Sequence, residues 1–155
     1  MAAVPNDPAS EPVLFAYDGS ELAALAIREA GRQLAPRREA LVLCVWQPAD
    51  VGFIPVDEQH FNTQNASEVK QAAERTADHG AAIAEQAGFR ARSLAVEAAP
   101  TWKGIVETAA EHDVSLIVLG SHRRTGFVGH LTGSVAAAVV QHATAASVLV
   151  VHQHA

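Results

Sequence analysis

The chain has few of the residues that mark disulfide-rich, membrane-spanning or DNA-binding proteins. Its single cysteine, Cys44, excludes an internal disulfide framework and a multi-cysteine zinc site. No apolar run approaches the roughly 20 residues that a transmembrane helix needs. The 11 Lys and Arg are outnumbered by 17 Asp and Glu, which gives a formal net charge of −6. This balance argues against general nucleic-acid binding and against attraction to an anionic membrane.

The chain does have enough apolar surface for one folded domain. It is 155 residues long, and 49% of these are hydrophobic although only 5% are aromatic. We expect a disordered tail over residues 1–11 and one domain over residues 12–155. The first eleven residues have neither a basic region nor an apolar core, so they lack the features of a signal peptide. Together with the lone cysteine, this predicts a protein of the reducing cytoplasm.

The apolar pattern switches repeatedly between short buried runs and helical spacing. An Asp-Gly-Ser turn follows the first run and provides Ser20 as a helix N-cap, and Pro100 fits the first position of a later helix. Residues 47–64 are irregular and polar. The runs predict strands at 12–17, 39–46, 90–96, 114–119 and 147–152, separated by helices over about 20–34, 67–87 and 100–110 and one that opens near 133.

This alternation predicts an open parallel α/β sheet with helices on both faces, because strands joined through helices need crossover connections. Ligands of such sheets bind beyond the carboxyl ends of the strands, where the strand order reverses. The segment after the first strand, 17–20, and the segment after the fourth strand, from Gly120, should therefore meet.

The glycine-rich segment 120–134 is the main candidate for chemistry. Glycines allow backbone N–H groups to approach an anion, and the helix opening at Ser134 would add the positive end of its dipole. Arg123 and Arg124 could supply charge to phosphates. The segment lacks the closing Lys of a Walker loop, and its glycines do not follow the first strand as in the dinucleotide fingerprint. On glycine spacing alone, a turn that merely starts a helix remains an equal alternative.

Three segments together resemble the universal stress protein family. The first is the turn 17–20, the second is the end of the fourth strand at 119–122, and the third is a Gly-Ser pair at the last helix with a Val-rich strand behind it. The similarity spans about residues 12–152. It implies an adenine nucleotide alpha-hydrolase-like fold with strand order 3-2-1-4-5, and a homodimer formed through the last strand, Ser147–His152.

The family's nucleotide-binding members carry a glycine, two residues, a glycine, nine residues, and then a glycine with Ser or Thr. This chain keeps the spacing, with Gly120 first and Gly133-Ser134 last, but has Arg123 in place of the second glycine. The Arg123 side chain either fills the phosphate site with its own charge or reaches round to hold the phosphates.

The resemblance also implies roles for single residues. Asp18 would hydrogen-bond the ribose or adenine with Tyr17 beside it, and Val45 would pack on the adenine ring. The sugar and phosphates would contact Gly120, Ser121, His122 and Arg123, and the phosphates would contact Gly133, Ser134 and Val135. From the residues alone, the alternative role for Asp18 is a charge at a helix start, and the alternative for Val45 is an ordinary core residue.

The resemblance implies a stress-response module that binds ATP, with or without Mg²⁺, or another adenine nucleotide. The alternative is a nucleotide-free dimeric interaction protein in which Arg123 occupies the phosphate site. We expect no enzyme beyond slow hydrolysis of bound nucleotide, since no Ser or Cys, His and carboxylate are placed to converge. An enzyme acting on a small phosphorylated metabolite is a weaker possibility. His152 and His154 lack a third ligand at suitable spacing, so no metal site is expected.

Overall fold

The computed structural model describes residues 11–47, 63–121 and 134–153. Residues 1–10, 48–62, 122–133 and 154–155 lie outside its described part, and with them almost all of the predicted tail and of the predicted irregular segment 47–64. The elements, in chain order, are β1 (Val13–Ala16), α1 (Glu21–Gln33), β2 (Glu39–Trp46), α2 (Thr63–Gln86), β3 (Arg90–Glu97), α3 (Thr101–Glu111), β4 (Leu116–Ser121), α4 (Val135–His142) and β5 (Ser147–His152).

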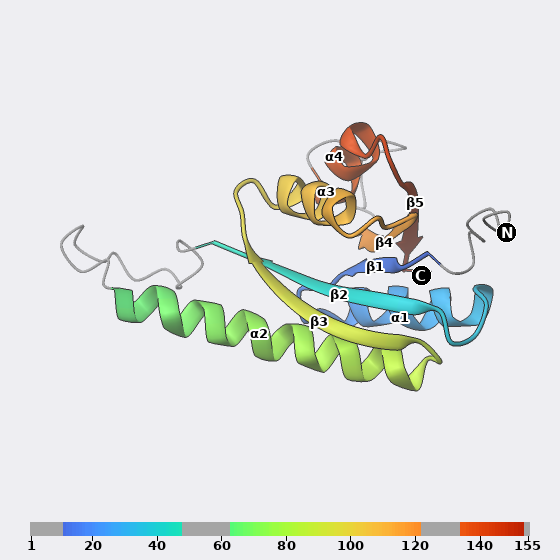
Figure 1. Cartoon of the computed structure of the whole chain (residues 1–155), viewed down its shortest axis with the longest axis horizontal. Coiled ribbons are helices and arrows are strands. Elements are labelled where there is room, and N and C mark those ends of the chain that lie inside the picture. The colour runs from blue at the N-terminus through green and yellow to red at the C-terminus, as the bar shows by residue number, and fades with distance from the viewer. Residues whose placement is uncertain (1–10, 48–62, 122–133, 154–155) are drawn as a thin grey trace, which may run out of the picture.

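All the strand pairs are parallel, and the sheet has the order β3-β2-β1-β4-β5, which confirms the predicted topology. β1 lies at the centre, where Val13 pairs with Ala40 of β2 on one side and with Leu116 of β4 on the other. Helices α1 and α2 cover one face, and α3 and α4 cover the other (Figure 1). The chain order of the strands reverses between β1 and β4, so a ligand crevice is expected at their carboxyl ends.

Two cores, one on each face, hold the helices to the sheet. Side chains of a strand alternate between faces. Phe15 therefore packs with Ile27 of α1 and stands edge-on to Phe89, with ring centroids 5.1 Å apart. Leu14 points the other way and packs with Ile105 of α3 and Val139 of α4. The central strand is buried on both faces, whereas the edge strands β3 and β5 are mostly half-buried.

The structure confirms the predicted cap at Ser20, adds a serine cap at Ser134, and differs from the prediction at Pro100. Ser20 caps α1, its Oγ accepting from the N–H of Ala23 at 3.1 Å, and Ser134 caps α4 in the same way. Pro100 is the N-cap of α3 instead of its first residue, and it makes no side-chain capping bond. Among the described residues, no helix is both long and apolar enough to cross a membrane.

The fourth strand differs from its prediction. It was expected over residues 114–119, but β4 spans Leu116–Ser121 because it pairs with β5 from Leu116↔Ser147 to Ser121↔His152. Val114 instead completes the end of α3, its N–H donating to the carbonyl of Ala109 at 2.9 Å. Gly120 and Ser121 are therefore strand residues and not part of a loop. The second helix also begins earlier than predicted, at Thr63.

Candidate functional site

A cleft of about 140 Å³ lies at the carboxyl ends of β1, β2 and β4, where the strand order reverses. Pockets that hold a whole ligand typically measure about 300–1,000 Å³, so this cleft has room for only part of such a ligand. Of the predicted site residues, the cleft brings together Tyr17, Asp18, Val45, Gly120 and Val135. The predicted residues His122, Arg123 and Gly133 lie outside the described part of the chain.

The turn after β1 holds Asp18 at the mouth of the cleft. One oxygen of its carboxylate, Oδ1, accepts a hydrogen bond from the N–H of Ser20 at 2.9 Å. Gly19 between them has a φ of +87°, a conformation that residues with side chains rarely adopt. Asp18 thus shapes the turn with one oxygen and is exposed to solvent, which leaves the other oxygen to accept from a ligand.

The side chain of Tyr17 lies in the core on the α1 and α2 face. A Cβ added at Gly80 of α2 would stand 2.6 Å from its Cδ1, and its ring centroid is 6.2 Å from that of His79. Burial raises the pKa of the Tyr17 phenol, and the carboxylates of Asp18 and Glu21 raise it further. The apolar wall of the cleft lies on the other face of the sheet, so the Tyr17 side chain points away from that wall. Tyr17 borders the cleft because it directly follows β1 at the carboxyl end of the strand.

The wall of the cleft on the α3 side is apolar. Val45 and Leu43 of β2 lie here with Ile105 of α3. The helix comes so close at Gly104 that an added Cβ would stand 3.1 Å from Cγ1 of Val45. Val45 is therefore both a core residue and part of the cleft surface, so the two interpretations that the sequence left open are compatible. Thr101, whose Oγ1 lies 3.5 Å from Nε2 of Gln47, also lines this side and was not predicted.

Gly120 lies at the end of β4, directly against the first turn of α1. A Cβ added there would stand 2.6 Å from Cγ of Leu22 and 3.0 Å from its carbonyl oxygen. This close approach is a packing reason for glycine that does not depend on a ligand. Sequence reasoning could not find it, because it depends on the distance between a helix and a strand that are far apart in the chain.

Ser121 and Ser134 were also predicted site residues; they adjoin the cleft residues Gly120 and Val135 in the chain but do not themselves line the cleft. Ser121 is only 4% exposed. Ser134 and Val135 begin α4, and Val135 reaches the cleft surface. The start of a helix presents unpaired N–H groups, which is where an anionic group of a ligand would be held.

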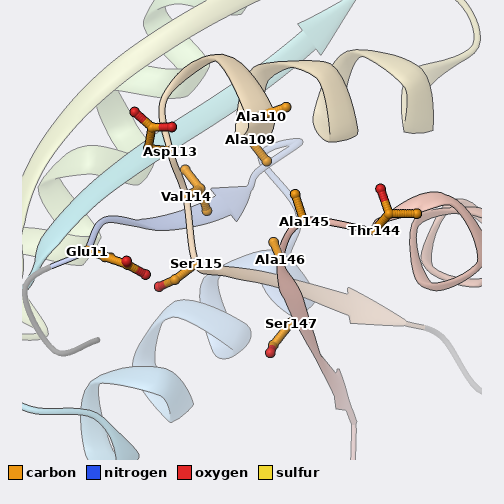
Figure 2. Close-up of a pocket in the computed structure, with 10 residues that line it drawn as sticks. All are labelled: Glu11, Ala109, Ala110, Asp113, Val114, Ser115, Thr144, Ala145, Ala146 and Ser147. Atoms are coloured by element: carbon orange, nitrogen blue, oxygen red, sulfur yellow. The ribbon is translucent and has the colours of Figure 1, made fainter. Parts of the chain in front are cut away.

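A larger and more open hollow of about 800 Å³ lies at the amino ends of β4 and β5 (Figure 2). Two carboxyl side chains, Glu11 and Asp113, border it together with small residues before β5. Negative charge disfavours a phosphate there, and ligands of open α/β sheets bind at the opposite, carboxyl ends of the strands. The smaller cleft is therefore the candidate site.

In the described segments of the chain, no three His, Cys, Asp or Glu residues gather in a way that could hold a metal ion. The predicted histidine pair is only half described, because His154 lies outside the described residues.

Comparison with known proteins identifies relatives over most of the chain. Residues 10–152 match the family model of the universal stress protein family. A universal stress protein of Mycolicibacterium smegmatis is 35% identical over 134 residues, which cover 86% of this chain and 43% of that protein. This chain therefore spans less than half the length of that relative.

Solved structures share the fold. The hypothetical protein MJ0577 superposes with a TM-score of 0.70 at 24% identity, covering 94% of this chain and 98% of that one. A universal stress protein in complex with cAMP gives 0.65 at 22% identity, with 94% and 99% covered. A universal stress protein from Archaeoglobus fulgidus in complex with dAMP gives 0.56 at 21% identity, with 90% and 96% covered.

Proposed function

This chain belongs to the universal stress protein family, and on that premise we propose that it is a stress-response module that binds an adenine nucleotide, ATP, in the cleft. The observation that carries the proposal is the convergence of Asp18, Val45, Gly120 and the start of α4 at one end of the sheet. Complexes of two proteins of the same fold with cAMP and dAMP support an adenine nucleotide as the ligand class.

The cleft has a suitable surface for each part of a nucleoside. The apolar side chains of Leu43, Val45 and Ile105 line the cleft and can pack against the base. Ribose hydroxyls and the adenine amino group are hydrogen-bond donors, and the second oxygen of the Asp18 carboxylate is an acceptor at the cleft mouth. We therefore assign the base to the β2 side of the cleft and the ribose to the turn after β1.

The phosphates would extend toward the first turn of α4. Ser134 and Val135 stand there, and Ser121 ends the neighbouring strand. Gly133, His122 and Arg123 join this proposed phosphate region through the family resemblance. If Arg123 clamps the phosphates, Arg123→Gly should weaken ATP binding, whereas if Arg123 fills the site, the same change should strengthen it.

The direct test is calorimetric titration with ATP, with and without Mg²⁺. Asp18→Asn is the most specific variant for this test. The amide oxygen of asparagine can still accept the hydrogen bond from the N–H of Ser20, whereas the second carboxylate oxygen is lost. Loss of a charge-assisted hydrogen bond, about 1.5–3 kcal/mol, should weaken binding about 10–100-fold. Asp113→Asn is the matched control, an exchange at the opposite end of the sheet where the φ of +52° suits asparagine. Absence of binding at millimolar ATP contradicts the proposal.

The alternative function is that of a nucleotide-free interaction protein. Its support is apolar surface near the sheet edge, since Val135 and Val140 of α4 are 43% and 49% exposed and β5 is an edge strand. With or without nucleotide, we propose that two copies associate through Ser147–His152, because an edge strand offers unpaired backbone groups. Sedimentation analysis tests this, and a monomer at high protein concentration contradicts it.

The proposed role is binding in the cytoplasm, with at most slow hydrolysis. Cys44, the single cysteine of this sequence, is buried, which suits a reducing compartment. Phosphate release from ATP, measured in parallel with binding, tests whether hydrolysis of the bound nucleotide is slow. The same assay with small phosphorylated metabolites as substrates tests the alternative of an enzyme, which would release phosphate rapidly from one of them and lose this activity in an Asp18 variant.

A further inference from the structure

Two buried polar atoms at the end of the sheet have no hydrogen-bond partner among the described residues. They are Oγ of Ser121 and Nδ1 of His152. The Ser121 side chain is almost wholly buried, at 4% exposure. Buried polar atoms in native proteins are nearly always hydrogen-bonded, so these two atoms are open to a bond from a water, an ion or a ligand group.

The two residues are neighbours on adjacent strands. Ser121 ends β4 and is paired in register with His152 at the end of β5. Leu119, two residues before Ser121, packs in the core under α3 and α4, and so does Val150, two residues before His152. Since side chains two apart share a face, Ser121 and His152 both point to the α4 side, on strands about 4.8 Å apart.

The first turn of α4 lies over this face. Ala136 and Val139 of α4 pack in the same core as Leu119. The N–H of Ala137 is taken by the Ser134 hydroxyl at 3.0 Å. The N–H groups of Val135 and Ala136 have no carbonyl acceptor within the helix, and they carry the positive end of its dipole.

We infer that His152 joins Ser121 and the first turn of α4, which the proposed function already assigns to the phosphates, in one subsite for a phosphate group beside the cleft. The Ser121 hydroxyl can donate a hydrogen bond, and so can the imidazole when Nδ1 carries the proton. Two helix amides add further donors, and the dipole favours an anion while opposing a cation. The inference rests on the proposed function in one respect, that the phosphate is part of a nucleotide.

His152 is the new element of this subsite. It lies outside the glycine-rich segment, and in the sequence it appears only as one of two histidines near the end of the chain. The parallel pairing of β4 with β5 is what brings it beside Ser121. A histidine at this position would make the protein favour phosphorylated over unphosphorylated adenosine.

The first test uses inorganic phosphate as the probe and imidazole ¹H–¹⁵N NMR spectra of the full chain as the readout. The signals of His152 are identified by their loss in His152→Gln. Phosphate should shift them saturably and should leave unchanged the signals of His112, which lies at the end of α3 and bonds the carbonyl of Thr108. No shift at His152, or equal shifts at both histidines, overturns the subsite.

The second test compares AMP with adenosine by calorimetry. His152→Gln and Ser121→Ala should each weaken AMP binding about tenfold and leave adenosine binding unchanged, with His112→Gln as the control. Variants that bind AMP like the wild type overturn the inference while the proposed function stands. If the wild type binds neither compound, the proposed function fails and the phosphate titration alone decides the subsite. Sedimentation of each variant checks that a change at the β5 edge has not altered self-association.

Discussion

Gly120→Ala should destabilise the protein, although the exchange adds only one methyl group. The added Cβ would stand 2.6 Å from Cγ of Leu22 and 3.0 Å from the Leu22 carbonyl oxygen. Ordinary carbon contacts are roughly 3.5–4.0 Å long. The side chain of Leu22 and the first turn of α1 must therefore move by about 1 Å, or β4 must move away from them.

Two opposing terms decide the sign of the effect. Replacing glycine restricts the unfolded chain and by itself stabilises by about 0.4–1 kcal/mol where the backbone permits alanine. Overpacking of a core costs about 1–3 kcal/mol. Because the conflict includes a backbone carbonyl and not only a flexible side chain, the packing cost should prevail and leave a net loss of about 1–2 kcal/mol.

Urea unfolding followed by circular dichroism measures this loss as a lower midpoint at unchanged slope. In a domain of this size each kcal/mol also lowers the melting temperature by about 2–4 °C. The double variant Leu22→Ala with Gly120→Ala supplies the internal control, since removal of Cγ leaves room for the new Cβ. The two changes together should cost less than the sum of the single ones. A Gly120→Ala protein as stable as the wild type would refute the packing argument.

Three further predictions concern single side chains. Tyr17 is the only tyrosine, and an ultraviolet titration should place the pKa of its phenol above the usual value of about 10. Because the pKa is higher in the folded state, the neutral phenol contributes stability that is fully present below the unfolded-state pKa. This contribution is lost as the pH rises through the folded-state pKa. A normal titration of Tyr17 in the native protein would contradict the prediction. Cys44, which is 8% exposed, should react with a thiol reagent far more slowly in native protein than in denaturant, and equal rates would show that it is accessible. Ser20→Ala should cost about 1 kcal/mol by removing the cap of α1, whereas Ser20→Gly should cost only a few tenths, as urea unfolding would measure.

The residues that form the cleft illustrate how far sequence reasoning reaches. Asp18 and Gly120 were expected to meet because parallel strands carry their ligand residues at the carboxyl ends, and both line the cleft. The orientation of Tyr17 toward α2 and the packing role of Gly120 against Leu22 were not accessible in the same way. Each depends on how closely a helix approaches the sheet, and no local pattern encodes that distance.

Local sequence patterns were enough to predict the alternation of strands and helices, the cap at Ser20, the start of a helix near Ser134, and through crossover geometry the parallel sheet. These follow from periodicity and capping, which act over a few residues. The end of β4 depends instead on a long-range contact, because pairing with β5 extends the strand to Ser121. The same pairing sets His152 beside Ser121. Strand register is a long-range property, settled by which buried faces fit together, and it selects the polar atoms that face the start of α4.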